Sequence, residues 1–121
     1  MVHVLMKHLA DRGEYAICSV IAQRFKETNI WRPEHYHLLL RAYSRSPDPD
    51  IETAFALLNE MKAVCQPQIM THNSILHIFS RKRMAKEAFE YRNKLIQEGV
   101  MLDRATYNIL LNVAVEVSLN K

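Results

Sequence analysis

The segment THNSIL at residues 71–76 decides the fold, because TYNILL at residues 106–111 repeats its pattern 35 residues later. The earlier segment YHLLL at residues 36–40 aligns with the middle copy at an offset of 36 residues. Markers of a second helix recur with the same internal spacing, namely Ala54-Phe55 with Met61 and Ala88-Phe89 with Leu95. A period near 35 residues indicates stacked repeats, each of them one pair of helices.

Hydrophobic residues three and four positions apart predict seven helices of about 11–14 residues. Pro33, followed by Glu34, is expected in the first turn of the third helix. Asp50 and Asp103 are expected to be N-caps, and Gly99 is expected to end the sixth helix in the left-handed conformation. The expected breaks between helices are Asp11–Gly13, Thr28–Asn29, Ser44–Asp50, Pro67 (with the next helix beginning at Thr71 or a close neighbour), Arg81–Arg83 and Gly99.

The composition supports an all-α fold. The chain has 121 residues, of which 49% are hydrophobic, but only two are glycine and four are proline. A β-rich fold of this length needs many turns, and turns use both residue types. A phosphate-binding loop, a dinucleotide fingerprint and a nucleophile elbow each require clustered glycines that this chain lacks. We therefore expect neither a nucleotide cofactor nor hydrolase chemistry.

The charge of the chain is compatible with an anionic partner, and the spacing of its cysteine, histidine and acidic residues does not favour a metal site. The net charge of +3 is mildly basic and is compatible with an anionic partner. The two cysteines, Cys18 and Cys65, lack the spacing of a metal site and are expected to be reduced. No pair of histidines has the one-turn spacing of a helical metal site, and the acidic segment 48–52 lacks the glycine of a calcium loop. No metal is expected.

The Thr106-Tyr107-Asn108 sequence followed by Leu110-Leu111, together with the Ala-Phe helix that carries Met seven residues on, resembles the pentatricopeptide repeat (PPR). The 34-residue tetratricopeptide pattern fits less well, because glycine does not occupy its required position. The resemblance implies an all-α right-handed solenoid of antiparallel helix pairs. It divides one array of residues 1–121 into a partial repeat 1–32, repeats 33–68 and 69–103, and a partial repeat 104–121.

The resemblance also implies a function, because PPR proteins bind single-stranded RNA at about one base per repeat. An early polar residue of each first helix reads the base together with the last residue of the repeat. Carried over, this pair is Asn73 with Asp103, a combination that resembles a uracil reader. The remaining implied positions are His37 with Gln68 and Asn108 for reading, and Met70 and Ala105 for stacking on bases.

Each of these positions has a simpler interpretation. Asn73 could be an exposed polar residue and Asp103 an ordinary N-cap. Residues 81–94 carry a net charge of +4, which is either a solvated turn with ion pairs along the helix or a contact with RNA phosphates. Trp31 is expected to pack between repeats, with base stacking as the alternative. The basic residues expected at the RNA backbone are Arg81, Lys82, Arg83 and Lys86.

The two ends of the chain are apolar, at Val2–Met6 and at Val113–Val117 followed by Leu119. Such faces predict contacts with neighbouring protein subunits at both solenoid ends, or self-association. The expected function is non-catalytic RNA binding in an organelle, in RNA processing, stability or translation. The alternative is a structural subunit of a large organellar ribonucleoprotein such as the mitochondrial ribosome, in contact with rRNA. A mitochondrial location is expected, with the plastid as the alternative, and no membrane or small-molecule substrate is expected.

Overall fold

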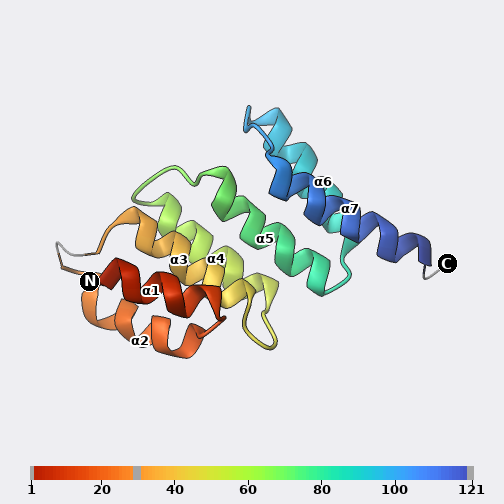
Figure 1. The fold of residues 1–121 in the computed structure, drawn as a ribbon. Helices are drawn as coiled ribbons and strands as arrows, with labels where there is room; N and C mark the ends of the chain where they lie inside the picture. The colour runs from red at the N-terminus through yellow and green to blue at the C-terminus, as the bar shows by residue number, and fades with distance from the viewer. Residues whose placement is uncertain (1, 29–30, 120–121) are drawn as a thin grey trace. The chain divides into compact units, whose positions relative to one another are not determined.

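The computed structural model describes residues 2–28 and 31–119, and all of their regular structure is helical. The seven predicted helices are confirmed (Figure 1). They are α1 (Val2–Asp11), α2 (Tyr15–Phe25), α3 (Pro33–Ser44), α4 (Ile51–Lys62), α5 (Ile69–Arg81), α6 (Ala85–Gln97) and α7 (Arg104–Leu119). None of the helices in these residues is long and apolar enough to span a lipid bilayer.

The end of the second helix differs from the predicted one. The second helix ends at Phe25, before the predicted break at Thr28 and Asn29, the latter of which lies outside the described residues. It ends early because the Thr28 hydroxyl and backbone N–H both donate to the Phe25 carbonyl, at 2.7 and 3.0 Å. The fifth helix begins at Ile69, a close neighbour of Thr71 as predicted, with Gln68 as its N-cap.

Three helices end in the same turn. Gly13, Arg83 and Gly99 all have positive φ angles, of 71°, 58° and 80°. In each turn the N–H of the residue with positive φ donates to the carbonyl three residues before it. The N–H of the following residue donates to the carbonyl five residues before that residue. This is the Schellman pattern, which satisfies carbonyls at a helix C-terminus. Gly13 and Arg83 are 70 residues apart, which is twice the 35-residue period of the sequence, so this turn recurs in register with the repeats.

The chain divides into two compact units, Met1–Pro67 and Gln68–Lys121. In the first unit, α3 packs against α1, α2 and α4, and α1 packs against α2. In the second unit, α5 packs against α6 and α7, and α6 packs against α7. Within each unit the first helices of successive pairs therefore stack on each other, as a helical solenoid requires. The boundary between the units, after Pro67, lies one residue before the predicted repeat boundary between residues 68 and 69. The continuous array and its handedness stay predictions.

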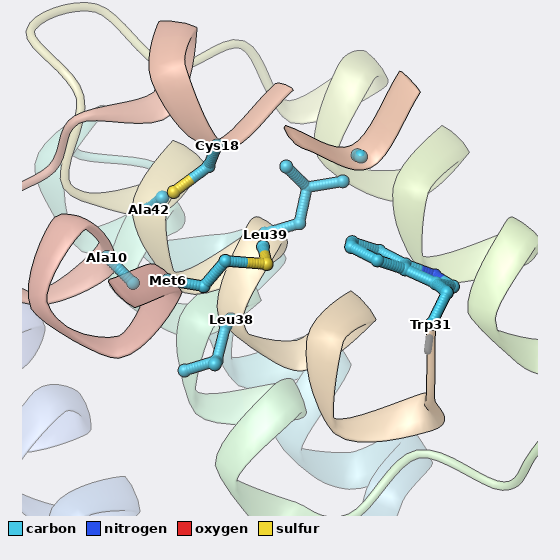
Figure 2. Packing of buried hydrophobic residues seen from close by; sticks show 8 residues of the cluster. Met6, Ala10, Cys18, Trp31, Leu38, Leu39 and Ala42 are labelled. Carbon is cyan, nitrogen blue, oxygen red and sulfur yellow. The ribbon is translucent and has the colours of Figure 1, made fainter. Parts of the chain in front are cut away.

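The first unit has a core made by α1, α2 and α3 together with Trp31. Met6 and Ala10 of α1 and Cys18 of α2 meet Leu39 of α3, with the Trp31 ring beside them (Figure 2). The turn between α1 and α2 is equally close-packed, because a Cβ on Gly13 would overlap the Arg45 carbonyl. Burial in this apolar core raises the pKa of the Cys18 thiol to about 11, and nearby Glu14 raises it further. The neutral thiol therefore behaves as a small hydrophobic residue.

The second unit is centred on α5, in which all residues from Thr71 to Leu76 are buried. Its contact with α6 includes a hydrogen bond of 2.7 Å between His72 Nδ1 and the Tyr91 hydroxyl. Burial, followed by the charge of Glu98, raises the pKa of Tyr91. Tyr91 therefore stays protonated and is available as a hydrogen-bond donor. This contact helps to fix the helix from which Asn73 projects.

Candidate nucleic-acid interface

The structure brings together Asn73 of α5 and Asp103, which precedes α7. Asn73 Nδ2 donates to Asp103 Oδ1 at a distance of 3.1 Å. The two residues are 30 positions apart in the sequence, and they meet because α5 and α7 pack side by side (Figure 1). This is the pair that the sequence predicted to read a base.

Thr106, in the first turn of α7, joins both members of the pair. Its backbone N–H donates to Asp103 Oδ1 at 3.0 Å, and its hydroxyl oxygen lies 2.7 Å from Asn73 Oδ1 and 2.9 Å from Asp103 Oδ1. The same hydroxyl accepts from the Asp103 backbone N–H at 3.2 Å. Because Asp103 Oδ1 already accepts two N–H donors, we assign the single hydroxyl proton to the shorter contact, with Asn73 Oδ1.

These hydrogen bonds set the charge and the orientation of the pair. The Thr106 backbone N–H, followed by the Asn73 side chain, holds the pKa of Asp103 below its usual value. Asp103 is therefore a carboxylate at neutral pH and can only accept, so the amide nitrogen of Asn73 must face it. The second Nδ2 proton of Asn73 and the Oδ2 oxygen of Asp103 have no hydrogen-bond partner among the described residues. The site thus offers one donor beside one acceptor.

The simpler interpretation, an N-cap at Asp103 and an exposed polar residue at Asn73, is correct for Asp103 only. Asp103 is indeed the N-cap of α7, in a reciprocal capping box with Thr106. However, Asn73 is only 9% exposed and is therefore not a solvated surface residue. A buried amide with fixed hydrogen bonds cannot turn freely, so the edge that it presents is constant. The capping role of Asp103 and its contact with Asn73 use the same carboxylate oxygen.

The two predicted stacking positions lie one turn before the reading positions. Met70 is exposed near the start of α5, and Ala105 is exposed near the start of α7. Both therefore remain accessible to a planar ligand. The Met70 side chain offers a large polarisable surface, whereas the methyl group of Ala105 offers little.

The other predicted reading residues lie on α3, at the N-cap of α5 and on α7. His37 lies on α3 of the first unit and is half-buried, and burial followed by nearby Arg41 lowers its pKa. Gln68 is the exposed N-cap of α5 and makes no capping hydrogen bond with its side chain. Asn108 is exposed on α7. Each of these three residues stays a predicted reading residue.

The four predicted phosphate-binding residues lie in the turn between α5 and α6 or at the adjoining ends of these two helices. All four are exposed, and they are Arg81, Lys82, Arg83 and Lys86. Arg83 has the left-handed conformation that glycine has at the two equivalent turns. An L-residue in this conformation costs about 1 kcal/mol relative to glycine. The chain therefore carries a cation at a position where backbone energetics favour glycine.

Trp31 is buried against α3, which supports the predicted packing role. Its ring centroid lies 5.1 Å from that of His35 and 5.4 Å from that of Tyr36. His35 Nδ1 accepts from the Arg32 backbone N–H at 2.8 Å, and burial, the largest influence, lowers the pKa of His35. Within residues 2–28 and 31–119, no group of three or more His, Cys, Asp or Glu side chains is placed to hold a metal ion.

Sequence reasoning missed Thr106 as a member of the site. The signal was present, because Asp103 and Thr106 have the three-residue spacing of a capping box. The repeat pattern used Thr106 only as a marker of the period. Its hydrogen bond to Asn73 depends on the packing of α7 against α5, which local sequence does not specify.

The second unit carries the recognisable repeat. Residues 67–115 match the PPR repeat family. The predicted resemblance is thereby confirmed over most of α5, α6 and α7, including the Asn73–Asp103 pair. PPR proteins are in general non-catalytic, helical-repeat RNA-binding proteins, so the match indicates RNA binding. No curated protein and no solved structure matched the chain.

Proposed function

We propose that this protein binds single-stranded RNA without catalysis and that its PPR-like second unit reads one uracil through Asn73 and Asp103. The observation that carries the proposal is the 3.1 Å hydrogen bond between these two side chains. It leaves an amide donor beside a carboxylate acceptor. That arrangement complements a base edge with a carbonyl oxygen beside an N–H group, as uracil has.

Contacts with the RNA backbone add affinity without base preference in this proposal. The exposed residues Arg81, Lys82, Arg83 and Lys86 supply the cations at the turn between α5 and α6. The left-handed conformation of Arg83 supports this assignment, because a glycine would fit the turn at lower energy. Binding should therefore weaken as the salt concentration rises.

A location in an organelle, with a role in RNA processing, stability or translation, completes the proposal. The second candidate is a structural subunit of an organellar ribonucleoprotein, with rRNA and neighbouring proteins as its partners. The exposed apolar side chains of Val4 and Leu5 on α1, and of Tyr107 and Leu111 on α7, favour this second candidate. They offer surface for protein contacts that base reading does not need.

The test compares single-stranded RNA oligonucleotides that differ only in one base, uracil, cytosine, adenine or guanine, within a fixed background. Guanine belongs in the set because it also presents a carbonyl beside an N–H. We expect the wild-type chain to prefer uracil over cytosine by about tenfold, as a mismatch of about 1.4 kcal/mol gives. Asn73→Ala should abolish the preference, because it removes the donor.

The matched control is Asn112→Ala, which removes an exposed asparagine of α7 that is not a predicted reading residue. This variant should keep the preference for uracil over cytosine. Weak binding of equal strength to all four strands, with a steep dependence on salt, would reject base reading. Co-purification with ribosomal subunits in that case would favour the structural role.

A further inference from the structure

Thr106 lies in the helix that follows the reading pair, yet it is the residue with the most hydrogen bonds to that pair. It contacts Asn73 through its hydroxyl and Asp103 through both its hydroxyl and its backbone N–H. It is also fully buried, with no exposed surface at all. Thr106 therefore cannot touch a base itself, and any effect on base recognition must act through its two partners.

We propose that Thr106 is a positioning residue that restricts Asn73 to donating to a base, so that the threonine of α7 sets the base preference of the repeat ending at Asp103. This inference rests on the proposed function. It adds a third residue to the site and makes the site depend on two successive helices. The contact that carries it is the 2.7 Å hydrogen bond from the Thr106 hydroxyl to Asn73 Oδ1.

The argument follows from counting donors and acceptors on the Asn73 amide. One Nδ2 proton is held by Asp103, and Oδ1 receives the Thr106 hydroxyl proton. The group left for a ligand is the second Nδ2 proton, which requires an acceptor such as a uracil carbonyl. The amino group of cytosine or adenine offers only donors to this position and is disfavoured.

Loss of the hydroxyl changes what the amide presents. Without Thr106 Oγ1, the buried Oδ1 of Asn73 has no donor, which is unfavourable for a buried carbonyl oxygen. With Oδ1 no longer held, the amide can rotate so that Oδ1 turns away from residue 106 toward the base, and a base amino group can then donate to it. The affinity for cytosine should rise relative to that for uracil. The preference for uracil over cytosine should therefore decrease, even if the variant still binds RNA.

The test variant is Thr106→Val, which keeps the shape of the side chain and the backbone N–H that binds Asp103. We expect the uracil over cytosine preference to fall from about tenfold to below about threefold, a loss of at least about half of the free-energy difference between the two bases. Thr106→Ser restores the hydroxyl and should restore most of the preference. A purely structural role would lower the affinity for all strands together and leave their ratio unchanged.

The matched control is Thr71→Val, which changes a threonine that is equally buried at the equivalent position of α5. It should alter stability without changing the ratio. A wild-type ratio in Thr106→Val, or a ratio that Thr106→Ser does not restore, overturns the role of the hydroxyl while base reading stands. Equal binding of all four bases by the wild-type chain overturns the proposed function instead.

A measurement on the wild-type chain covers the case in which Thr106→Val does not fold. In NMR spectra, the two Nδ2 protons of Asn73 should respond differently to a uracil-bearing strand. The proton held by Asp103 should keep its chemical shift, and the other should move. Movement of both protons, or of neither while the strand binds, contradicts the fixed orientation of the amide.

Discussion

A single carboxylate oxygen connects the capping of α7 with the proposed base-reading pair. Asp103 Oδ1 caps α7 through the Thr106 N–H and also accepts from Asn73 Nδ2. The N-cap was predictable from residue type, whereas the repeat resemblance led to the proposed reading role of Asn73 and Asp103. Their use of one shared oxygen was not predictable, because it depends on how close α7 lies to α5.

Arg83 shows a position where backbone preference and side-chain chemistry conflict. Its φ of 58° is the left-handed conformation of a helix-ending glycine. We expect Arg83→Gly to raise the free energy of unfolding by about 1 kcal/mol, measured by urea denaturation, because glycine adopts this conformation without the Cβ clash. If its charge binds phosphate, the same variant should also show a shallower dependence of RNA affinity on salt.

The control is the reverse change at the equivalent turn of α6. Apart from Gly99 itself and its two chain neighbours, no heavy atom of the described residues lies within 4 Å of a Cβ added to Gly99, whose φ is 80°. Gly99→Ala should therefore lower stability by about 1 kcal/mol through backbone conformation alone. A stability of Arg83→Gly at or below that of the wild type would show that the arginine side chain stabilises the turn.

At the scale of the helix, α5 and α7 have related sequences but different surroundings. Leu76 of α5 is fully buried, whereas Leu111, at the same place 35 residues later, is 61% exposed. His72 packs on α6 through Tyr91, whereas the equivalent Tyr107 is exposed. The period predicted both helices correctly. It could not predict which of them has a covered face, because burial depends on the neighbouring helix.

The open face of α7 should cause self-association of the isolated chain. We expect Leu111→Lys to lower the sedimentation-detected fraction of oligomers without lowering the free energy of unfolding, because this side chain is already largely in water. Adjacent Leu110 is 5% exposed, so Leu110→Lys should instead unfold the helix. A wild-type chain that sediments as a monomer at high concentration would contradict the sequence-based expectation of apolar end contacts.

At the scale of the whole molecule, the sequence predicted seven helices that recur as pairs, the last without its partner, and residues 2–28 and 31–119 contain seven helices. The predicted apolar ends are only partly correct. Met6 and Val113 lie inside the packed units, whereas Val4, Leu5, Val115 and Val117 are exposed, and the side chains of Val2 and Leu119 lie outside the described residues. The sequence-based prediction assumed that all residues of an apolar run lie on the same face of a helix. A helix turns its residues to different sides, so only part of any run can meet a partner.

Because each of the two compact units has its own buried side chains, the units should lose structure separately, as short-range packing in helical repeats allows. Leu39 lies in the core of the first unit (Figure 2). Leu39→Ala should reduce hydrogen-exchange protection in α1–α3 by about 2–5 kcal/mol, because it leaves a cavity. Protection in α5–α7 should change much less, and the uracil preference should persist.

The matched change in the second unit is Leu76→Ala, at an equally buried leucine of α5. It should reverse the pattern, lowering protection in α5–α7 and removing the uracil preference while α1–α3 stay protected. Equal loss of protection in all helices after either substitution would mean that the chain unfolds as one cooperative structure. In that event neither unit would be stable without the other, and the proposed reading site would depend on packing throughout the chain.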